Sequence, residues 1–412
     1  MVKITGNAKL SISRHGFPLV ISITFDIIFL LRYVIVLHYI TESIKKQELL
    51  FLSFYGKIKI RNKKKLERKE RRMNPKYTKK IVALILLLSL LFVPSCGKRQ
   101  KEYETTCFEY FDTFSTLTVY TNNKEDFEKY SDTFQSMLKE YHELLDIYHE
   151  YDRITNLKTI NDSNSAVTVD PKLGEFLKFG KEMYNLTDGY TNIAMGSVLS
   201  LWRTARENEK LPSKRALEEA NKHVNINDLQ ISEDGTLIQK NDPELRIDAG
   251  AIGKGFVAEK IAKEVEAMGC KSFLLNLGGN TVAHGTKPKD EPYLAGIENP
   301  TEGEGLRGSV ELSGYALVTS GSYQRYFTVN ETKYHHIIHP KTLYPENYCL
   351  SVSVLCPDSG VADALSTALF SMSVEDGMEL LKKRDDVEVI WLFPDGSTKM
   401  TDGFMDHVKT EK

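Results

Sequence analysis

The sequence lacks an excess of charge of either sign. Its 54 Lys and Arg residues against 56 Asp and Glu residues leave a formal charge of −2. A protein that binds the phosphate backbone of nucleic acid needs a basic surface, and a nearly neutral net charge gives no overall basic surface. Hydrophobic residues make up 41% of the 412 residues, enough for a large globular core. We therefore expect no nucleic-acid partner.

The chain is also poor in cysteine, and its 5 cysteines lack the spacing of a zinc site or a redox dithiol. Neither a CxxC pair nor a combination of CxxC with HxxxH occurs. We expect Cys107, Cys270, Cys349 and Cys356 to be buried free thiols, because cysteine packs as a small hydrophobic residue. A disulfide is the alternative outside the cytoplasm.

No stretch of the sequence combines the length and the composition of a good membrane span. Residues 17–40 are long enough, but Asp26 and Arg32 lie among them, and each costs about 3 kcal/mol at the centre of a bilayer. Residues 81–93 are apolar but too few to cross about 30 Å of hydrocarbon as a helix.

The apolar block 81–93 has instead the features of an export signal. Two lysines precede it, and Ser95 and Cys96 follow at the place of a cleavage site. A cysteine there resembles the lipobox of bacterial lipoproteins, in which the thiol is diacylated, although Pro94 departs from the usual pattern. We expect a lipoprotein signal peptide at 73–96, with Cys96 as the anchor at the extracytoplasmic face of the cell membrane. An ordinary cleaved signal is the alternative.

A signal peptide that starts at residue 73 lies unusually far into a chain, which suggests that translation begins at Met73. Lys69-Glu70 can be encoded by AAGGAG, a ribosome-binding sequence, a short distance upstream. Residues 1–72 would then be no part of the native protein. The alternative is a coincidence in a run rich in Lys, Glu and Arg.

Beyond the signal we expect a linker at 97–105 and a catalytic domain at 106–412. Alternating polar and β-branched or aromatic residues predict a strand at 108–120, and helical spacing predicts a helix at 125–151. Asp170-Pro171 and a following Thr-Asp-Gly predict a helix with sharp ends at 171–186. Further helices are expected at 361–372, at 374–382 and within 201–224, and strands at 272–277, at 387–393 and within 292–357. The mixed order favours an α+β fold with flanking helices over a doubly wound one.

A glycine-rich loop, Asp248-Ala-Gly-Ala-Ile-Gly-Lys254-Gly255, precedes one predicted helix. Glycines let the backbone approach a ligand, and a helix N-terminus attracts anions because its first N–H groups are unpaired. The spacing fits neither a Walker loop nor a dinucleotide fingerprint. A structural turn is the alternative.

Asp363 and Thr367 lie four residues apart, so on a helix their oxygens face the same side, one turn apart. A carboxylate and a hydroxyl so placed can bind a hard cation such as Mg²⁺. The alternative is that Asp363 merely favours the first turn of a helix and that Thr367 packs.

Three histidines, His335, His336 and His339, surround an apolar Ile-Ile pair. On a strand His336 and His339 would point to opposite faces, whereas His335 and His339 could share one. Alternation alone favours polar residues of a half-exposed strand.

Together, the segments that carry these residues resemble the FAD:protein FMN transferase (ApbE-like) family. The resemblance covers about residues 106–404 and implies the α+β fold of that family. It rests on EYDRITNLKTIND, TDGYTNIAMGSVLSLW, IDAGAIGKGF, LLNLGGN, AGIENP, LVTSGSYQRYF, YHHIIHPKTLYP and VADALSTALF.

The resemblance also implies a site. Mg²⁺ would be held by Asp363, Thr367 and the backbone carbonyl of Ala251. FAD would meet Asp248 and Lys254, with Tyr190, Thr191, Asn192 and Met195 along the flavin side and His336 beside the phosphates. The sequence departs from the family at two places: the family's HIID is HIIH here, so that His339 replaces a carboxylate, and Thr191 stands where an aromatic residue is more usual.

The implied reaction is Mg²⁺-dependent cleavage of FAD, in which a Thr or Ser hydroxyl of an acceptor protein attacks the FMN phosphorus and AMP leaves. His336 or Asp363 would take the hydroxyl proton. The acceptor is expected to be an exported or membrane electron-transfer protein. Two alternatives remain: a Mg²⁺-dependent FAD pyrophosphatase, and a flavin-binding lipoprotein without catalysis. A purely structural surface protein would leave the glycine loop and the Asp363–Thr367 pair unexplained.

Overall fold

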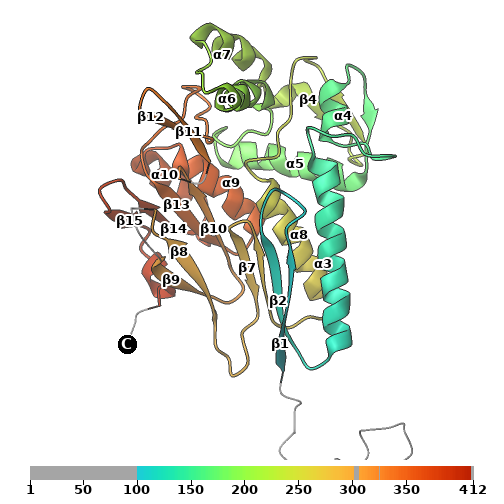
Figure 1. The fold of residues 1–412 in the computed structure, drawn as a ribbon, viewed down its shortest axis with the longest axis vertical. Helices are drawn as coiled ribbons and strands as arrows, with labels where there is room; N and C mark the ends of the chain where they lie inside the picture. The colour runs from blue at the N-terminus through green and yellow to red at the C-terminus, as the bar shows by residue number, and fades with distance from the viewer. Residues whose placement is uncertain (1–99, 301–305, 324, 410–412) are drawn as a thin grey trace, which may run out of the picture. The chain divides into compact units, whose positions relative to one another are not determined.

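The computed structural model describes residues 100–300, 306–323 and 325–409 (Figure 1). The predicted start at Met73, the signal peptide 73–96 and the anchor Cys96 lie outside these residues and stay predictions. Within the described part, no helix has the length and apolar character needed to cross a membrane.

An eight-stranded antiparallel sheet forms the centre of the domain. Its strand order is β1-β2-β6-β7-β10-β13-β14-β15, so the chain leaves the sheet and returns to it several times. The strands are β1 (Lys101–Cys107), β2 (Ser115–Thr121), β6 (Phe273–Leu277), β7 (Asn280–His284), β10 (Ala316–Gly321), β13 (Ser351–Cys356), β14 (Glu388–Leu392) and β15 (Thr398–Met400).

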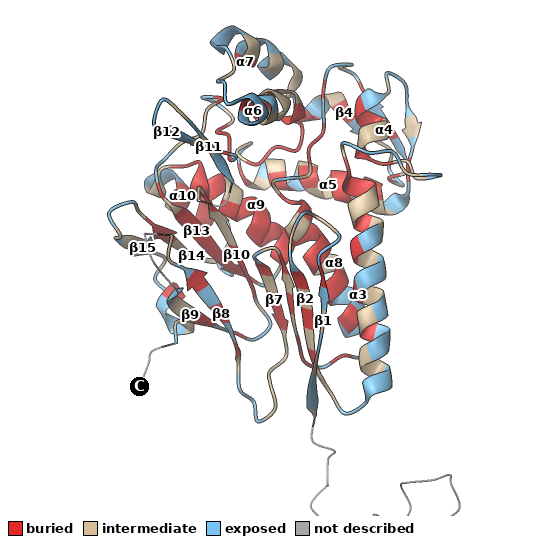
Figure 2. Ribbon diagram, in the orientation of Figure 1, coloured by how far each residue is buried: buried red, intermediate tan, exposed pale blue. Residues whose placement is uncertain are grey.

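Three helices cover one face of this sheet. Helix α8 (Gly253–Ala267) packs between α3 (Lys124–Leu145) and α9 (Ser359–Phe370) and contacts β6 and β7, while α9 contacts β10 and β13. Figure 2 shows the consequence for burial, since α8 and α9 are largely buried whereas α3 is exposed along its outer side. The helix α10 (Val374–Leu381) follows α9.

A two-stranded ribbon, β8 (Tyr293–Glu298) and β9 (Leu306–Leu312), covers the opposite face. Strand β13 shows why both faces need a cover. Val352 and Val354 pack with the helices, whereas Leu355 packs with the ribbon, because successive side chains of a strand point to opposite faces.

Most of the remaining elements form the upper part of the molecule in Figure 1, above the C-terminal end of α3 and the N-terminal end of α8. A third apolar cluster joins α6 to the β11–β12 hairpin and the loop after it, with Trp202 and Leu343 buried in it. The elements are α4 (Leu157–Asp162), α5 (Pro171–Leu186), α6 (Gly196–Asn208), α7 (Lys214–Ala220), β3 (Val167–Thr168), β4 (Leu229–Ile231), β5 (Leu237–Lys240), β11 (Tyr326–Val329) and β12 (Thr332–His335), with two short 3₁₀ helices, Asn221–His223 and Ile226–Asp228. A third 3₁₀ helix, Phe404–His407, contacts β9 and β14 instead.

Several sequence expectations are confirmed. The mixed helices and sheets agree with the predicted α+β class, and α5 has the predicted bounds with Asp170 as N-cap and Pro171 in the first turn. The four cysteines of the described region are buried free thiols.

Other expectations are wrong in detail. The expected linker 97–105 contains the start of β1 at Lys101, and the strand expected at 108–120 begins only at Ser115. Helix α3 ends at Leu145, six residues before the expected end at 151, because Asp146 leaves the helical conformation with ψ of 130°. The histidine segment is no strand beyond His335.

Candidate functional site

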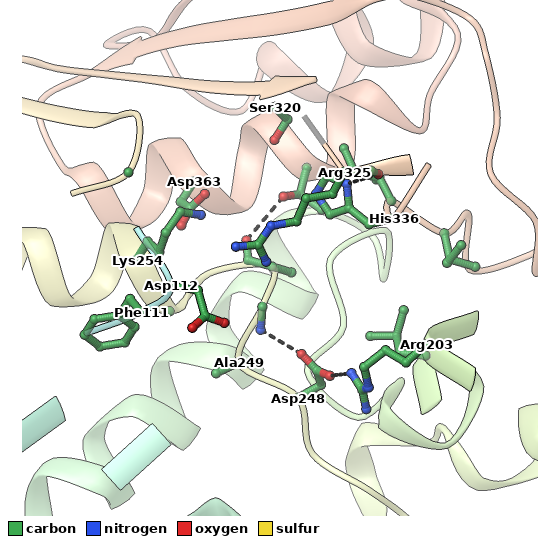
Figure 3. A pocket seen from close by; sticks show the side chains of 18 of the residues that line it. Phe111, Asp112, Arg203, Asp248, Ala249, Lys254, Ser320, Arg325, His336 and Asp363 are labelled. Atoms are coloured by element: carbon green, nitrogen blue, oxygen red, sulfur yellow. Dashed lines mark hydrogen bonds and ion pairs between the residues drawn. The ribbon is translucent and has the colours of Figure 1, made fainter. Parts of the chain in front are cut away.

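A pocket of about 570 Å³ opens at the N-terminal end of α8, in the size range of small-molecule sites. The structure brings every residue of the predicted site to its wall. Figure 3 shows Asp248, Lys254, His336 and Asp363 among the lining residues. These residues are Tyr190, Thr191, Asn192, Met195, Asp248, Ala251, Lys254, His336, Asp363 and Thr367.

Asp363 lies where the N-terminus of α8 meets α9. Its Oδ2 accepts a hydrogen bond of 2.7 Å from the Gly255 N–H, and its side chain is 4% exposed. The anion at this helix N-terminus is therefore a carboxylate of the protein itself. Burial raises the pKa of Asp363, and the nearby Lys254 and the Gly255 N–H act against that rise. Such a carboxylate is stabilised by any further positive charge in the pocket.

Gly255 makes this contact possible. A Cβ atom at residue 255 would lie 2.4 Å from the Asp363 Cβ and 2.4 Å from the Ser359 carbonyl oxygen. Only a residue without a side chain lets the two helices approach so closely. The predicted glycine-rich loop thus serves the packing of α8 on α9 as well as the pocket.

Thr367 follows Asp363 by one turn on α9, as predicted. Its hydroxyl donates a hydrogen bond of 3.2 Å to the Ala251 carbonyl oxygen. A carboxylate, a hydroxyl and a carbonyl thus converge at one place, and oxygen ligands of this kind suit a hard cation. Among the described residues there is no cluster of three or more His, Cys, Asp or Glu side chains able to hold a metal.

A positively charged region faces Asp363. Figure 3 shows Lys254 beside Asp363, with Arg325 and His336 on the neighbouring wall. The His336 Nδ1 lies 3.2 Å from the Arg325 carbonyl oxygen, which can only accept, so Nδ1 carries the proton and Nε2 is free to take one.

His336 is exposed at the pocket wall, but the surrounding protein still desolvates its ring in part. This desolvation lowers the pKa of His336 to about 4; the hydrogen bond to the Arg325 carbonyl opposes the shift, and the charges of Arg325 and Lys254 reinforce it. The imidazole is neutral at pH 7 as a result.

Asp248 is oriented by a set of buried contacts. Its Oδ2 pairs with the Arg203 guanidinium and its Oδ1 accepts a 2.8 Å hydrogen bond from the Gly250 N–H. The preceding residue, Ile247, is held by Asn161 through bonds of 2.6 Å and 2.9 Å. Asp248 therefore meets the pocket as half of an ion pair, which the sequence did not reveal.

The segment between α5 and α6 supplies the predicted flavin side. Tyr190 is half-buried at the wall, and the Asn192 side chain donates to the Val224 carbonyl at 2.9 Å. Thr191 is turned away, because its hydroxyl donates a 2.7 Å hydrogen bond to the Ala364 carbonyl of α9. The residue that replaces the usual aromatic thus ties this segment to the helix of Asp363.

A polar network on the same pocket was missed in the sequence. The Asp146 carboxylate accepts from the Tyr151 hydroxyl at 2.7 Å and lies 2.9 Å from the His149 Nδ1. Burial would raise the pKa of Asp146, but hydrogen bonds from Tyr148, Tyr151 and His149 lower it below its usual value. The dense run of titratable residues directly after α3 was the available signal.

Comparison with protein families identifies the family of the chain. The model of the ApbE family matches residues 111–391. The chain belongs to the ApbE family.

Members of the ApbE family with similar sequences are FAD:protein FMN transferases. The one of Treponema pallidum is 31% identical over 262 residues, which cover 60% of this chain and 72% of that protein. The one of Escherichia coli K12 is 24% identical over 345 residues, covering 79% of this chain and 97% of that protein.

Solved ApbE structures share the fold. The ApbE protein of Thermotoga maritima aligns with a TM-score of 0.69 at 26% identity and covers 75% of this chain and 100% of its own. The flavin transferase ApbE of Vibrio cholerae aligns with a TM-score of 0.65 at 23% identity over 75% of this chain and 99% of its own. The predicted fold and the resemblance on which it rested are confirmed.

Proposed function

We infer that this chain is an FAD:protein FMN transferase, an enzyme that cleaves FAD and attaches FMN to a hydroxyl of an acceptor protein. Membership of the ApbE family and the transferase relatives support the activity. The observation that carries it is the meeting of Asp363, Thr367 and the Ala251 carbonyl with Lys254 in one pocket.

The charges of the pocket suit a pyrophosphate. The two phosphates of FAD are anionic, and Lys254 and Arg325 line the wall beside His336. Cations in a partly desolvated site stabilise the charge that grows on the phosphate oxygens as the bond to the leaving group breaks. Binding and electrostatic stabilisation are thus assigned to Lys254 and Arg325.

The proton of the acceptor hydroxyl is assigned to His336. The oxygen of the acceptor hydroxyl forms a bond to the FMN phosphorus. The bond between this phosphorus and the bridging oxygen of the pyrophosphate breaks, and AMP departs with the bridging oxygen. The hydroxyl proton moves to the unprotonated Nε2 of His336. The rise in negative charge near His336 when FAD binds favours this transfer, because an anion raises the basicity of an imidazole.

We propose Mg²⁺ as the metal of this site, held by Asp363, Thr367 and the Ala251 carbonyl. The donor set fits a hard cation, and the raised pKa of the buried Asp363 carboxylate marks a site where added positive charge stabilises the ionised form. When bound, Mg²⁺ supplies Lewis-acid polarisation of a phosphate oxygen. The chain's own part is to hold the three oxygens close to Lys254.

The acceptor is proposed to be an exported or membrane electron-transfer protein, which the enzyme meets at the extracytoplasmic face. The signal-like segment 73–96 with Cys96 supports this placement, because it would tether the enzyme there. The hydroxyl that receives FMN would belong to a Thr or Ser.

The test compares AMP release with and without an acceptor protein. A transferase holds the hydroxyl in line with the phosphorus, and positioning of this kind is worth effective molarities of about 10⁵ M or more. AMP release is therefore expected to rise steeply with acceptor, and mass spectrometry should find FMN on one Thr or Ser, lost when that residue becomes Ala. Equal AMP release with and without acceptor, and no gain in acceptor mass, would instead identify an FAD pyrophosphatase.

A further inference from the structure

A single helical turn, residues 340–342, follows the pocket-lining residues Ile337 and Ile338, and His339 caps it. The His339 Nδ1 accepts hydrogen bonds of 3.0 Å from the Lys341 N–H and 3.1 Å from the Thr342 N–H. The turn closes through a 2.9 Å bond from the Leu343 N–H to the His339 carbonyl. Pro340 occupies the first position of the turn, where its missing N–H costs nothing.

This geometry explains how a histidine replaces a carboxylate here. Side chains that cap a helical turn accept from the second and third N–H groups, as Asp and Asn do with Oδ1. Nδ1 lies at the same position along the side chain as Oδ1. The replacement works only while Nδ1 is unprotonated, because a protonated nitrogen has no lone pair to offer.

The capped turn holds the flavin side of the pocket in place. The Lys341 ammonium donates to the Tyr190 hydroxyl at 3.1 Å and lies 4.6 Å from the centre of the Tyr190 ring. The His339 ring packs edge-on against the same ring, with centroids 5.5 Å apart. From the end of the turn, the Leu343 carbonyl accepts the Trp202 indole N–H at 2.9 Å.

We propose that His339, as a neutral imidazole, is a positioning residue that fixes Tyr190 at the wall of the FAD pocket, directly and through Lys341, and that protonation of its Nδ1 breaks the cap and weakens FAD binding. This proposal rests on the proposed function for the identity of the ligand.

The surroundings of His339 keep it neutral. Among the described residues, the titratable groups facing it are Lys341 and Glu346 of its own loop and Tyr190 of the α5–α6 connection. Burial lowers the pKa of His339, the carboxylate of Glu346 raises it, and the charge of Lys341 lowers it, with a net fall below the usual value.

Because the pKa of His339 is lower in the folded protein, acidification weakens the cap. The unfolded chain takes up the His339 proton at a higher pH than the folded one, so the cap contributes its full stability above the ordinary histidine pKa of about 6.5. That contribution is lost as the pH falls from there toward the folded pKa. Protonation of His336 has the opposite effect on FAD, because it adds positive charge beside Lys254 and Arg325 and strengthens pyrophosphate binding.

The experiment measures FAD affinity by flavin fluorescence, without acceptor, between pH 5 and pH 7.5. We expect His339→Ala to raise Kd about fivefold to tenfold at pH 7.5 and His339→Asn to restore it to within about twofold, because Oδ1 of Asn can cap the turn. On acidification, Kd of the wild type should rise several-fold more than Kd of His339→Asn. His284→Asn, which alters a histidine that does not line the pocket, should follow the wild type.

Two results of the binding experiment overturn the proposal: equal pH dependence of Kd in wild type and His339→Asn, or unchanged affinity in His339→Ala. Urea unfolding provides a test that needs no ligand, since the wild type should lose stability relative to His339→Asn between pH 7.5 and pH 5, and equal losses would also contradict it. If FAD binds with this pH dependence but no FMN reaches an acceptor, the proposed transfer fails and the role of His339 stands.

Discussion

At the residue scale, two groups on the pocket wall have properties that their sequence neighbours do not explain. Asp363 is a carboxylate buried at a helix–helix contact, and His336 is an imidazole with a pKa of about 4. Both states arise from segments that are distant in the chain. Each can be tested by a change that preserves shape and removes charge or basicity.

Replacing Asp363 should abolish activity while the fold persists. Asp363→Asn keeps an acceptor for the Gly255 N–H and removes the charge, and Asp363→Ala removes both. We expect AMP release to fall at least about 10³-fold in both variants, because the proposed Mg²⁺ site would lose the negative charge of its carboxylate. Thr367→Ala should weaken the dependence on Mg²⁺ less severely.

Thermal unfolding, measured in parallel with the AMP assay, separates a loss of activity from a loss of folding. The melting temperature of Asp363→Asn should stay close to that of the wild type. Turnover of this variant at the wild-type rate, or activity that persists in EDTA, would show that the metal site is misassigned.

His336 should set the acidic limit of the transfer rate. The neutral imidazole accepts the proton, so kcat/KM, which reports the free enzyme, should be level above about pH 5 and fall as the pH approaches the pKa of about 4. The corresponding fall in kcat should lie at higher pH, because bound FAD raises the basicity of His336. His336→Gln should lower kcat by about 10² to 10⁴ and remove this limb. If His336→Gln kept the wild-type pH profile of kcat, the general base would have to be another residue.

At the scale of elements, the site depends on how closely α8 approaches α9. Gly255 permits that approach, and Thr191 ties the α5–α6 connection to α9 through the Ala364 carbonyl. The positions of Lys254 and Asp363 are therefore set by helix packing rather than by a flexible loop. A small change at the contact between α8 and α9 should therefore shift both Lys254 and Asp363.

Gly255→Ala should destabilise the domain. The added Cβ would lie 2.4 Å from the Ser359 carbonyl oxygen, a backbone atom that cannot rotate away, and overpacking of this kind costs about 1–3 kcal/mol. Gly308→Ala on β9 is the matched control, because a Cβ there meets nothing within 4 Å. Urea unfolding should show a lower midpoint only for Gly255→Ala, and equal midpoints would refute the packing argument.

At the scale of the whole molecule, the catalytic domain and the segment before it have different roles. The domain carries the pocket, while residues 73–96 carry the features of an export and lipidation signal. The placement of the enzyme relative to its acceptor depends on the segment 73–96.

We expect the native polypeptide to begin at Met73 and the mature one at a lipidated Cys96, because the charged and apolar regions and Ser95-Cys96 occur in the order of such a signal. Mass spectrometry of the protein extracted from membranes measures the mature N-terminus and its modification. Peptides from before Met73 would refute the proposed start, and an unmodified Cys96 in the membrane fraction would refute the anchor. Cys96→Ser should release the protein from membranes.

The sequence alone determined the class of the fold and much of the site. Caps and periodicity encode local structure, so α5 was predicted at its observed bounds from Asp170, Pro171 and the following turn. The spacing of Asp363 and Thr367 predicted that both lie on one face of a helix, and the resemblance carried by the ordered motifs named residues that the structure places around one pocket.

Only the tertiary structure decided what depends on contacts between distant segments. Strand β1 is an exposed edge strand of mostly polar residues, without a hydrophobic alternation to reveal it, and it is held by pairing with β2. The bond from Gly255 to Asp363 joins residues 108 positions apart, and the Arg203–Asp248 pair joins residues 45 apart. Local propensity carries no information about such meetings, because they are fixed by which faces of the helices pack together.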